Sequence, residues 1–254
     1  MILDLFKLDG KVALVTGAGQ GLGQGMSIAL AEAGADIASL DRTGCEGTCE
    51  AVRALGRRYH ESVVDLREAS VDNLKDVVGQ IVSELGRIDI LVNNAGTIRR
   101  TPAVDFSEAD WDDVLQINLK AAFFLSQAVA HVMLSQGCGK IINIASMLSF
   151  QGGVTVPSYT AAKSALAGIT RALANEWAQH NISVNAIAPG YMATDNTAAL
   201  RADPGRSKSI LERIPAGRWG TPDDLKGAVV FLASSASDYV NGAIIPVDGG
   251  WLAR

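Results

Sequence analysis

The chain has 254 residues, of which 48% are hydrophobic, and a formal net charge of −5. This length and apolar content suffice for one large core, so we expect a single domain over residues 1–254. The acidic balance, without a long basic run, argues against a nucleic acid or an anionic membrane as partner. No stretch reaches the roughly 20 uninterrupted apolar residues of a membrane span, and we therefore expect a soluble, cytoplasmic protein.

Cysteine and histidine are few and scattered. Cys45, Cys49 and Cys138 form no CxxC pair and no zinc pattern with the three histidines. We therefore expect neither a disulfide nor a metal site.

The first element in chain order is an apolar strand that runs through a glycine-rich turn into a helix, in the segment KVALVTGAGQGLGQGMSIALAEAGA. Gly17 permits the tight turn, Gly21 lets the backbone approach a pyrophosphate, and Gly23 allows close helix packing. The N-terminus of the helix offers free N–H groups to an anion. This pattern predicts a dinucleotide site, to which Gln20 and Leu22 of the same turn also belong.

The next apolar stretch, DIASL, leads directly into Asp41. This is about the 20-residue distance expected for the acid that binds the adenosine ribose. A carboxylate there accepts hydrogen bonds from the ribose hydroxyls and repels a 2′-phosphate, which favours NAD over NADP. NADP is not excluded as the cofactor, because Arg42 directly follows the acid and an arginine there can accommodate a 2′-phosphate.

Apolar, β-rich segments then alternate with stretches of helical period along the rest of the chain. This rhythm predicts an α/β fold with a doubly wound, Rossmann-like parallel sheet. Right-handed crossovers place the carboxyl ends of its strands along one edge, where we expect the site. The irregular stretch 194–220 is rich in polar residues, and we interpret it as a small helical lid over the substrate. The predicted strands are VALVT, DIASL, RYHESVV, IDILVNN, KIINIA, ISVNAIA and GAIIPV.

A tyrosine and a lysine lie one helical turn apart in PSYTAAKSALAGIT. A phenol has a pKa near ~10 and moves protons at neutral pH only if a nearby cation stabilises the phenolate. Lys163, four residues after Tyr159, supplies that cation, and Ser146 at the end of KIINIAS can face the phenol as a second hydrogen-bond donor. Taken alone, the pair would equally suit a solvated helix face.

Together these motifs resemble the short-chain dehydrogenase/reductase family over essentially the whole chain. Segments such as NNAGTIRR and NAIAPGYMATDNT resemble, more closely, the dehydrogenases of sugar acids within that family. The resemblance implies hydride transfer between a nicotinamide cofactor and a carbonyl, with Tyr159 as proton donor or acceptor. The motifs that carry it are T16-G17-x-x-x-G21-x-G23, N93-N94-A95-G96, Asn118, Ser146, Y159-x-x-x-K163 and P189-G190-x-x-x-T194.

The resemblance also implies roles for residues outside the glycine turn. Lys163 grips the nicotinamide ribose, and Asn118 holds a water that links Lys163 to solvent, although a buried structural amide is the alternative. Asp65 and Leu66 correspond to an adenine-binding pair, although Asp65 could simply be a solvated strand-end acid. The remaining residues that line the cofactor in relatives correspond here to Asn94, Ala95, Gly96, Pro189, Gly190, Met192 and Thr194.

A sugar-acid substrate needs a clamp for its carboxylate, and arginine matches the two oxygens best. Arg99 and Arg100 follow the NNAG segment and should reach the mouth of the cleft, with a solvated loop pair as the alternative. Met147 and Gln151, just beyond Ser146, are expected to shape the pocket.

Two other functions stay open. Another reductase of the same family, acting on gluconate or on a thioester of acyl carrier protein, would share these motifs. A non-catalytic dinucleotide sensor would not need Ser146, Tyr159, Lys163 and Asn118 together, because a binder needs no proton relay. Relatives form tetramers, so we expect a homotetramer.

Overall fold

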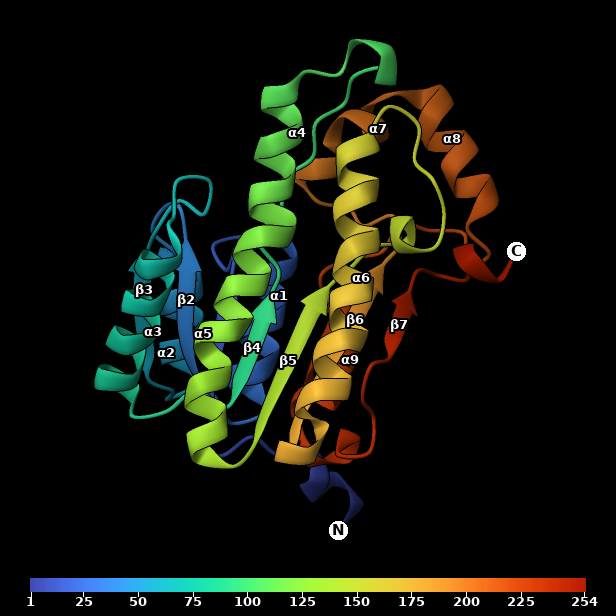
Figure 1. Ribbon diagram of the computed structural model, residues 1–254. Coiled ribbons are helices and arrows are strands. Elements are labelled where there is room, and N and C mark those ends of the chain that lie inside the picture. Colours follow the sequence, from blue (N-terminus) through green and yellow to red (C-terminus); the bar gives the residue numbers. More distant parts are fainter.

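Seven parallel strands form one sheet in the computed structural model, which describes residues 1–254 (Figure 1). Their order, β3-β2-β1-β4-β5-β6-β7, confirms the expected doubly wound, Rossmann-like arrangement. Each predicted strand segment overlaps an observed strand, with ends that agree to within a few residues. The strands are β1 (Val12–Thr16), β2 (Asp36–Asp41), β3 (Tyr59–Val63), β4 (Ile90–Asn93), β5 (Gly139–Ile144), β6 (Ile182–Pro189) and β7 (Ile244–Val247).

Helices cover both faces of the sheet (Figure 1). Helices α3, α5 and α6 pack on one face and share a core with it, whereas α1, α2 and α9 pack on the other. The helices are α1 (Gly21–Glu32), α2 (Glu46–Ala54), α3 (Val71–Leu85), α4 (Glu108–Leu115), α5 (Ala121–Gln136), α6 (Pro157–Trp177), α7 (Ala198–Ala202), α8 (Pro204–Arg213) and α9 (Asp223–Ala233).

The central strands are mostly apolar because both of their faces are covered. Successive side chains of a strand point to opposite faces. In β1, Val12 and Leu14 join the core under α3, α5 and α6, and Ala13 and Val15 join the core under α1 and α9. All four side chains are fully buried. A continuous apolar run, rather than an alternating one, is the sequence that such a strand requires.

The chain reverses its direction of winding between β1 and β4, which are neighbours in the sheet. Ligands of open parallel sheets bind outside the carboxyl ends of the strands at such a switch point. The glycine turn follows β1, and Asn94 follows β4 on the other side of the switch. Asp41 ends β2, and Ser146 is the second residue after the end of β5. The topology therefore brings the predicted site residues to one edge.

Helix α4, the short π-helical segment η3 (Gln116–Lys120) and α5 form one continuous run, Glu108–Gln136. By length and composition alone this run could cross a membrane. Its apolar side chains, including Leu125, Val129 and Met133, lie instead in the core on the sheet. Burial against β-strands explains the composition of this helix.

The stretch that we interpreted as a lid contains the 3₁₀ turn η6 (Asp195–Thr197) followed by α7 and α8. Figure 1 shows these two helices beside the upper ends of α4 and α6, close to the C-terminus. The lid rests on an apolar cluster of its own, in which Ile210 and Ile214 pack with Met147 and Trp251. Because Met147 follows Ser146 directly, the lid packs against the segment that carries a catalytic candidate.

Candidate active site

The glycine turn has the shape of an anion cradle. Gly17 has φ +65°, in the left-handed region that favours glycine. A Cβ on Gly23 would lie 1.9 Å from the carbonyl oxygen of Gly17, so no other residue fits there. Helix α1 begins at Gly21, and the side chain of Gln20 makes no capping hydrogen bond. The first N–H groups of α1 are therefore left for a ligand, and the turn fits the pyrophosphate of a dinucleotide.

Asn94 and Thr16 hold this turn in place. The side-chain amide of Asn94 donates to the carbonyl oxygens of Thr16, at 2.9 Å, and Gly17, at 3.1 Å. The hydroxyl of Thr16 accepts from the backbone N–H groups of Asn94 and Ala95. Thus the Asn94 side chain positions the backbone around the cofactor site. Sequence reasoning assigned no such function to Thr16, whose only signal was its place before the first glycine.

Asp41 lies beside the glycine turn, and both of its carboxylate oxygens are oriented by the backbone. Oδ2 accepts from Gly19 N at 2.9 Å, and Oδ1 accepts from Arg42 N at 2.7 Å. The Arg42 side chain is exposed. Asp65 lies in the loop after β3, where Val64 N donates to the carbonyl oxygen of Asp41. The structure therefore brings the predicted ribose-binding acid and the predicted adenine-binding loop to the same corner.

Ser146, Tyr159 and Lys163 also meet. Pro157 starts helix α6, which places Tyr159 in its first turn and Lys163 one turn later. The Lys163 ammonium is buried and donates to the carbonyl oxygen of Ile144, in β5, at 2.7 Å. Lys163 Nζ lies 5.6 Å from the centre of the Tyr159 ring. The Ser146 hydroxyl accepts from Leu148 N at 3.1 Å, which leaves its own hydrogen free to donate.

Burial shifts the pKa values of both titratable side chains of this group. It lowers the pKa of Lys163 to about 8, so most of these lysines still carry a charge at neutral pH. Burial also raises the pKa of the Tyr159 phenol, and the two opposing influences are the hydrogen bond with Ser146 and the positive charge of Arg100. Arg100 is thus a second positive charge near the phenol, in addition to the Lys163 ammonium expected there.

Asn118 lies in the π-helical segment η3, and its side chain is buried. Its amide N–H₂ donates to the carbonyl oxygens of Thr97 and Val114, both at 2.9 Å. Its Oδ1 is buried without a partner, and a Cβ on Gly96 would lie 2.7 Å from it. Asn118 therefore joins two segments of backbone through its amide N–H₂ group. Its oxygen remains available to accept a hydrogen bond from a ligand.

The segment after β6 closes the other side of the glycine turn. The backbone N–H of Gly190 donates to the Val247 carbonyl oxygen at 3.0 Å, and Met192 is buried. The Thr194 methyl would lie 3.7 Å from a Cβ on Gly21. Thus Thr194, at the start of the lid, faces the turn that cradles the predicted dinucleotide.

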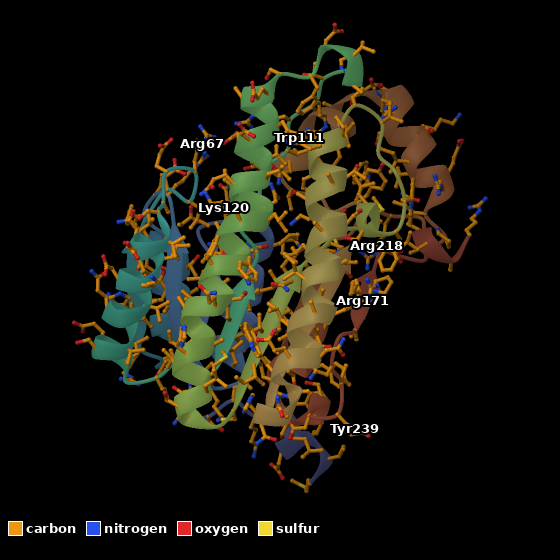
Figure 2. The ribbon with its side chains drawn as sticks, in the orientation of Figure 1. Arg67, Trp111, Lys120, Arg171, Arg218 and Tyr239 are labelled. Atoms are coloured by element: carbon orange, nitrogen blue, oxygen red, sulfur yellow. The ribbon has the colours of Figure 1, made fainter.

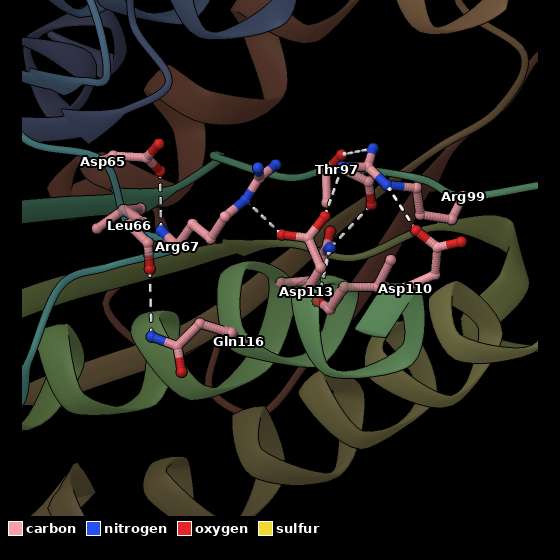
Figure 3. Close-up of polar contacts among 10 residues, drawn as sticks. Asp65, Leu66, Arg67, Thr97, Arg99, Asp110, Asp113 and Gln116 are labelled. Atoms are coloured by element: carbon pink, nitrogen blue, oxygen red, sulfur yellow. Dashed lines mark hydrogen bonds and ion pairs between the residues drawn. The ribbon is translucent and has the colours of Figure 1, made fainter. Parts of the chain in front are cut away.

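The two candidate arginines point to different places. Arg99 pairs with Asp113 at 2.5 Å and with Asp110 at 3.3 Å, both on helix α4 (Figure 3). Arg100 instead donates to the Asn196 carbonyl oxygen of the lid at 3.0 Å and lies near enough to Tyr159 to affect its pKa. Arg100 is therefore the better placed of the two to bind a substrate. Of the other predicted pocket residues, Gln151 accepts from Arg213 at 3.3 Å, and Met147 lies under the lid.

No group of three or more histidine, cysteine or acidic side chains is placed to hold a metal ion. All three cysteines are free.

Comparison with known proteins gives consistent matches. The family model described as Enoyl-(Acyl carrier protein) reductase matches residues 17–252. The chain is 62% identical, over 100% of both chains, to 2-dehydro-3-deoxy-D-gluconate 5-dehydrogenase of Escherichia coli strain K12. It is 63% identical to the enzyme of the same name from Dickeya dadantii, again over 100% of both chains.

A solved structure from Agrobacterium tumefaciens, of a protein proposed to be a 2-deoxy-D-gluconate 3-dehydrogenase, has NADP bound. It is 54% identical and superposes with a TM-score of 0.91, covering 99% of this chain and 100% of its own.

Lys163→Met should remove one pH dependence of stability. Burial lowers the pKa of Lys163 from 10.5 to about 8, so between these values the unfolded chain binds more protons. The wild-type free energy of unfolding should therefore rise relative to that of the variant, by about 2–3 kcal/mol from pH 8 to pH 10. Denaturant titrations at several pH values measure this difference, and parallel stability curves for the two proteins would contradict it.

Proposed function

Because the chain belongs to the short-chain dehydrogenase/reductase family, we propose that it interconverts 2-dehydro-3-deoxy-D-gluconate and its 2,5-diketo form by hydride transfer. The convergence of Ser146, Tyr159 and Lys163, at the same edge of the sheet as the glycine turn, is the observation that carries the chemistry. The choice of substrate rests on relatives more than 60% identical over their whole length.

The chain's own residues provide the binding site for the dinucleotide, which supplies the hydride chemistry when bound. The glycine turn and the N-terminus of α1 would hold its pyrophosphate, and Asp41 its adenosine ribose. The segment Pro189–Thr194 and Lys163 would hold the nicotinamide end. The sheet edge thus accepts an elongated ligand that runs from Asp41, at the end of β2, to the lid.

Proton transfer belongs to Tyr159. In the direction of reduction the phenol donates its proton to the carbonyl oxygen of the substrate, and in oxidation the phenolate takes it back. The Ser146 hydroxyl, whose acceptor side is occupied by Leu148 N, donates a second hydrogen bond to the same oxygen. The charge of Arg100 favours the phenolate. Arg100 would also attract the substrate carboxylate, for which arginine offers a planar pair of donors.

We also propose that NAD is preferred over NADP. The Asp41 carboxylate, held by Gly19 N and Arg42 N, would oppose a 2′-phosphate at the ribose it binds. The exposed Arg42 and the NADP bound by the Agrobacterium relative point the other way, so the ratio of the two activities has to be measured. A homotetramer acting in the cytoplasm completes the proposal, and light scattering measures the assembly.

A substrate panel tests the function directly. 2-Dehydro-3-deoxy-D-gluconate, gluconate, 5-ketogluconate and an acyl thioester would each be assayed in the appropriate direction with both nicotinamide cofactors, following absorbance of the reduced form. We expect the highest kcat/KM with the deoxy sugar acid. A higher value with gluconate or the thioester would replace this proposal by one of the other reductase activities. Dinucleotide binding without turnover of any compound would favour a sensor.

Tyr159→Phe should abolish turnover and leave dinucleotide affinity nearly unchanged. General acid–base catalysis supplies about 10²–10⁴ in rate, and a positioned phenol near a cation should lie at the upper end. Stopped-time assays and nicotinamide fluorescence measure the two quantities. Retention of more than about a tenth of the activity would contradict the assignment.

Asp41→Ala should shift the choice of cofactor. Removal of a like charge close to the 2′-phosphate, with Arg42 left in place, should raise kcat/KM for NADPH relative to NADH by roughly 10-fold or more. Arg42→Ala is the matched control and should move the ratio in the opposite direction. A wild-type enzyme that already prefers NADPH would contradict the electrostatic argument.

Arg100→Ala should raise KM for the sugar acid. A charge-assisted bond in a partly desolvated cleft is worth roughly 1.5–3 kcal/mol, which corresponds to about 10–100-fold in KM. Dinucleotide affinity should hardly change. Arg206→Ala removes an exposed lid arginine and serves as the control. If Arg206→Ala raises KM and Arg100→Ala does not, the carboxylate binds the lid instead.

A further inference from the structure

One carboxylate on helix α4 joins two loops that belong to opposite ends of the proposed cofactor site. Asp113 Oδ1 lies 2.6 Å from Arg67 Nε, and Asp113 Oδ2 lies 2.5 Å from Arg99 Nη2 (Figure 3). The Asp113 side chain is only 12% exposed, whereas the two arginines are 43% and 34% exposed. The acid is thus the fixed centre of the group, and the two guanidinium groups lie on either side of it.

Arg67 belongs to the adenosine end. It lies in the loop after β3, and its backbone N–H donates to Asp65 Oδ1 at 2.9 Å. The same loop is tied to the end of β2, because Val64 N donates to the Asp41 carbonyl oxygen. Figure 2 shows Arg67 between this loop and helix α4. Any shift of Arg67 therefore reaches the residues proposed to bind adenosine.

Arg99 belongs to the substrate end. It directly precedes Arg100, which contacts the lid at the Asn196 carbonyl oxygen and influences Tyr159. Arg99 Nη1 also donates to Thr97 Oγ1 at 3.1 Å, so Arg99 fixes the loop that leads out of β4. The orientation of Arg99 thereby limits where Arg100 can point.

The same helical run holds both loops at two further points. Gln116 Nε2 donates to the Leu66 carbonyl oxygen at 3.2 Å, and Asn118 Nδ2 donates to the Thr97 carbonyl oxygen at 2.9 Å. Asp113, Gln116 and Asn118 lie within two turns of one helix. The end of α4 and the π-helical segment therefore form a rigid connection between the adenosine loop and the substrate loop.

The ionic part of this connection has little apolar support. Arg67, Arg99 and Asp113 form part of the wall of an open cavity of about 740 Å³, most of whose lining residues are polar. Polar contacts rather than apolar packing therefore hold the two arginines, and the Asp113 carboxylate is the contact that they share. Without that charge the guanidinium groups would repel each other across the gap.

We propose that Asp113 is a positioning residue that couples dinucleotide binding at the adenosine end to binding of the sugar acid at Arg100. The inference rests on the proposed function for the identity of the substrate, but not for the dinucleotide. Coupling between sites is reciprocal, so the dinucleotide and the sugar acid should change each other's affinity by the same factor. If the three side chains carry this coupling, a substitution at either arginine should also change binding at the opposite end of the cleft.

The first test replaces the acid by its neutral isostere. D113N should raise KM for the sugar acid by about 5–20-fold and the dissociation constant of NADH by about 3–10-fold, with kcat changed less than about 3-fold. D36N is the matched control: Asp36 pairs with Arg58 at 2.8 Å and is 17% exposed, but lies at the opposite end of β2. D36N should alter none of the three constants.

The second test measures coupling across the cleft. R67Q, at the adenosine end, should raise KM for the sugar acid about 3–10-fold, and R99Q should weaken NADH binding, followed by nicotinamide fluorescence without substrate, by a similar factor. When D113N is already present, R67Q should change KM for the sugar acid, and R99Q the dissociation constant of NADH, by less than about 2-fold. A merely structural role for Asp113 would lower thermal stability and leave these cross-effects at zero.

Independent, multiplicative effects in the double variants would overturn the proposal, as would an unchanged KM in R67Q. The fluorescence measurement of NADH binding distinguishes failure of the coupling proposal from failure of the proposed function. If no sugar acid is turned over, the coupling can still be tested by NADH binding alone. R99Q should weaken NADH binding in the wild-type background and should have little effect when D113N is present.

Discussion

A parallel sheet covered by helices on both faces leaves only the ends of its strands open to a ligand, and the rest of this molecule follows from that constraint. The strands of the centre are buried on both sides, so most of their side chains serve packing and are out of reach of a ligand. The candidate site residues stand where the strands end, as in Asp41 at the end of β2, Asn94 after β4 and Ser146 after β5. The site is therefore assembled from short loops whose positions the sheet register determines.

These loops are stabilised by side chains that form hydrogen bonds with backbone groups. Each of these side chains keeps one further donor or acceptor available for a ligand. Asn118 uses its amide N–H₂ for two carbonyl groups and keeps its oxygen unpaired. Ser146 accepts from a backbone N–H and keeps its hydrogen. The Lys163 ammonium donates one N–H to the Ile144 carbonyl oxygen, and its other N–H groups remain available as donors. Each residue is thus oriented by the fold before a ligand arrives, which lowers the cost of ordering the site during reaction.

Much of this arrangement could be predicted from the sequence because the signals are local. The glycine spacing, the interval to Asp41 and the helical spacing of Tyr159 and Lys163 each depend on a few neighbouring residues, and the structure brings all of them to one edge. The positive charge of Arg100 near Tyr159 could not be predicted in this way. It depends on how the fold brings together two residues that are far apart in the chain.

Arg99 and Arg100 show why sequence alone does not separate neighbouring residues of one type. Both follow the same strand and have the same chemistry, yet one faces helix α4 and the other faces the lid. The difference comes from Asp110 and Asp113, which offer Arg99 two carboxylates on the helix side and leave Arg100 with only a backbone carbonyl. A carboxylate of a ligand is a stronger partner for a guanidinium than that carbonyl. The acidic residues of α4 therefore determine which of the two arginines remains available to a ligand.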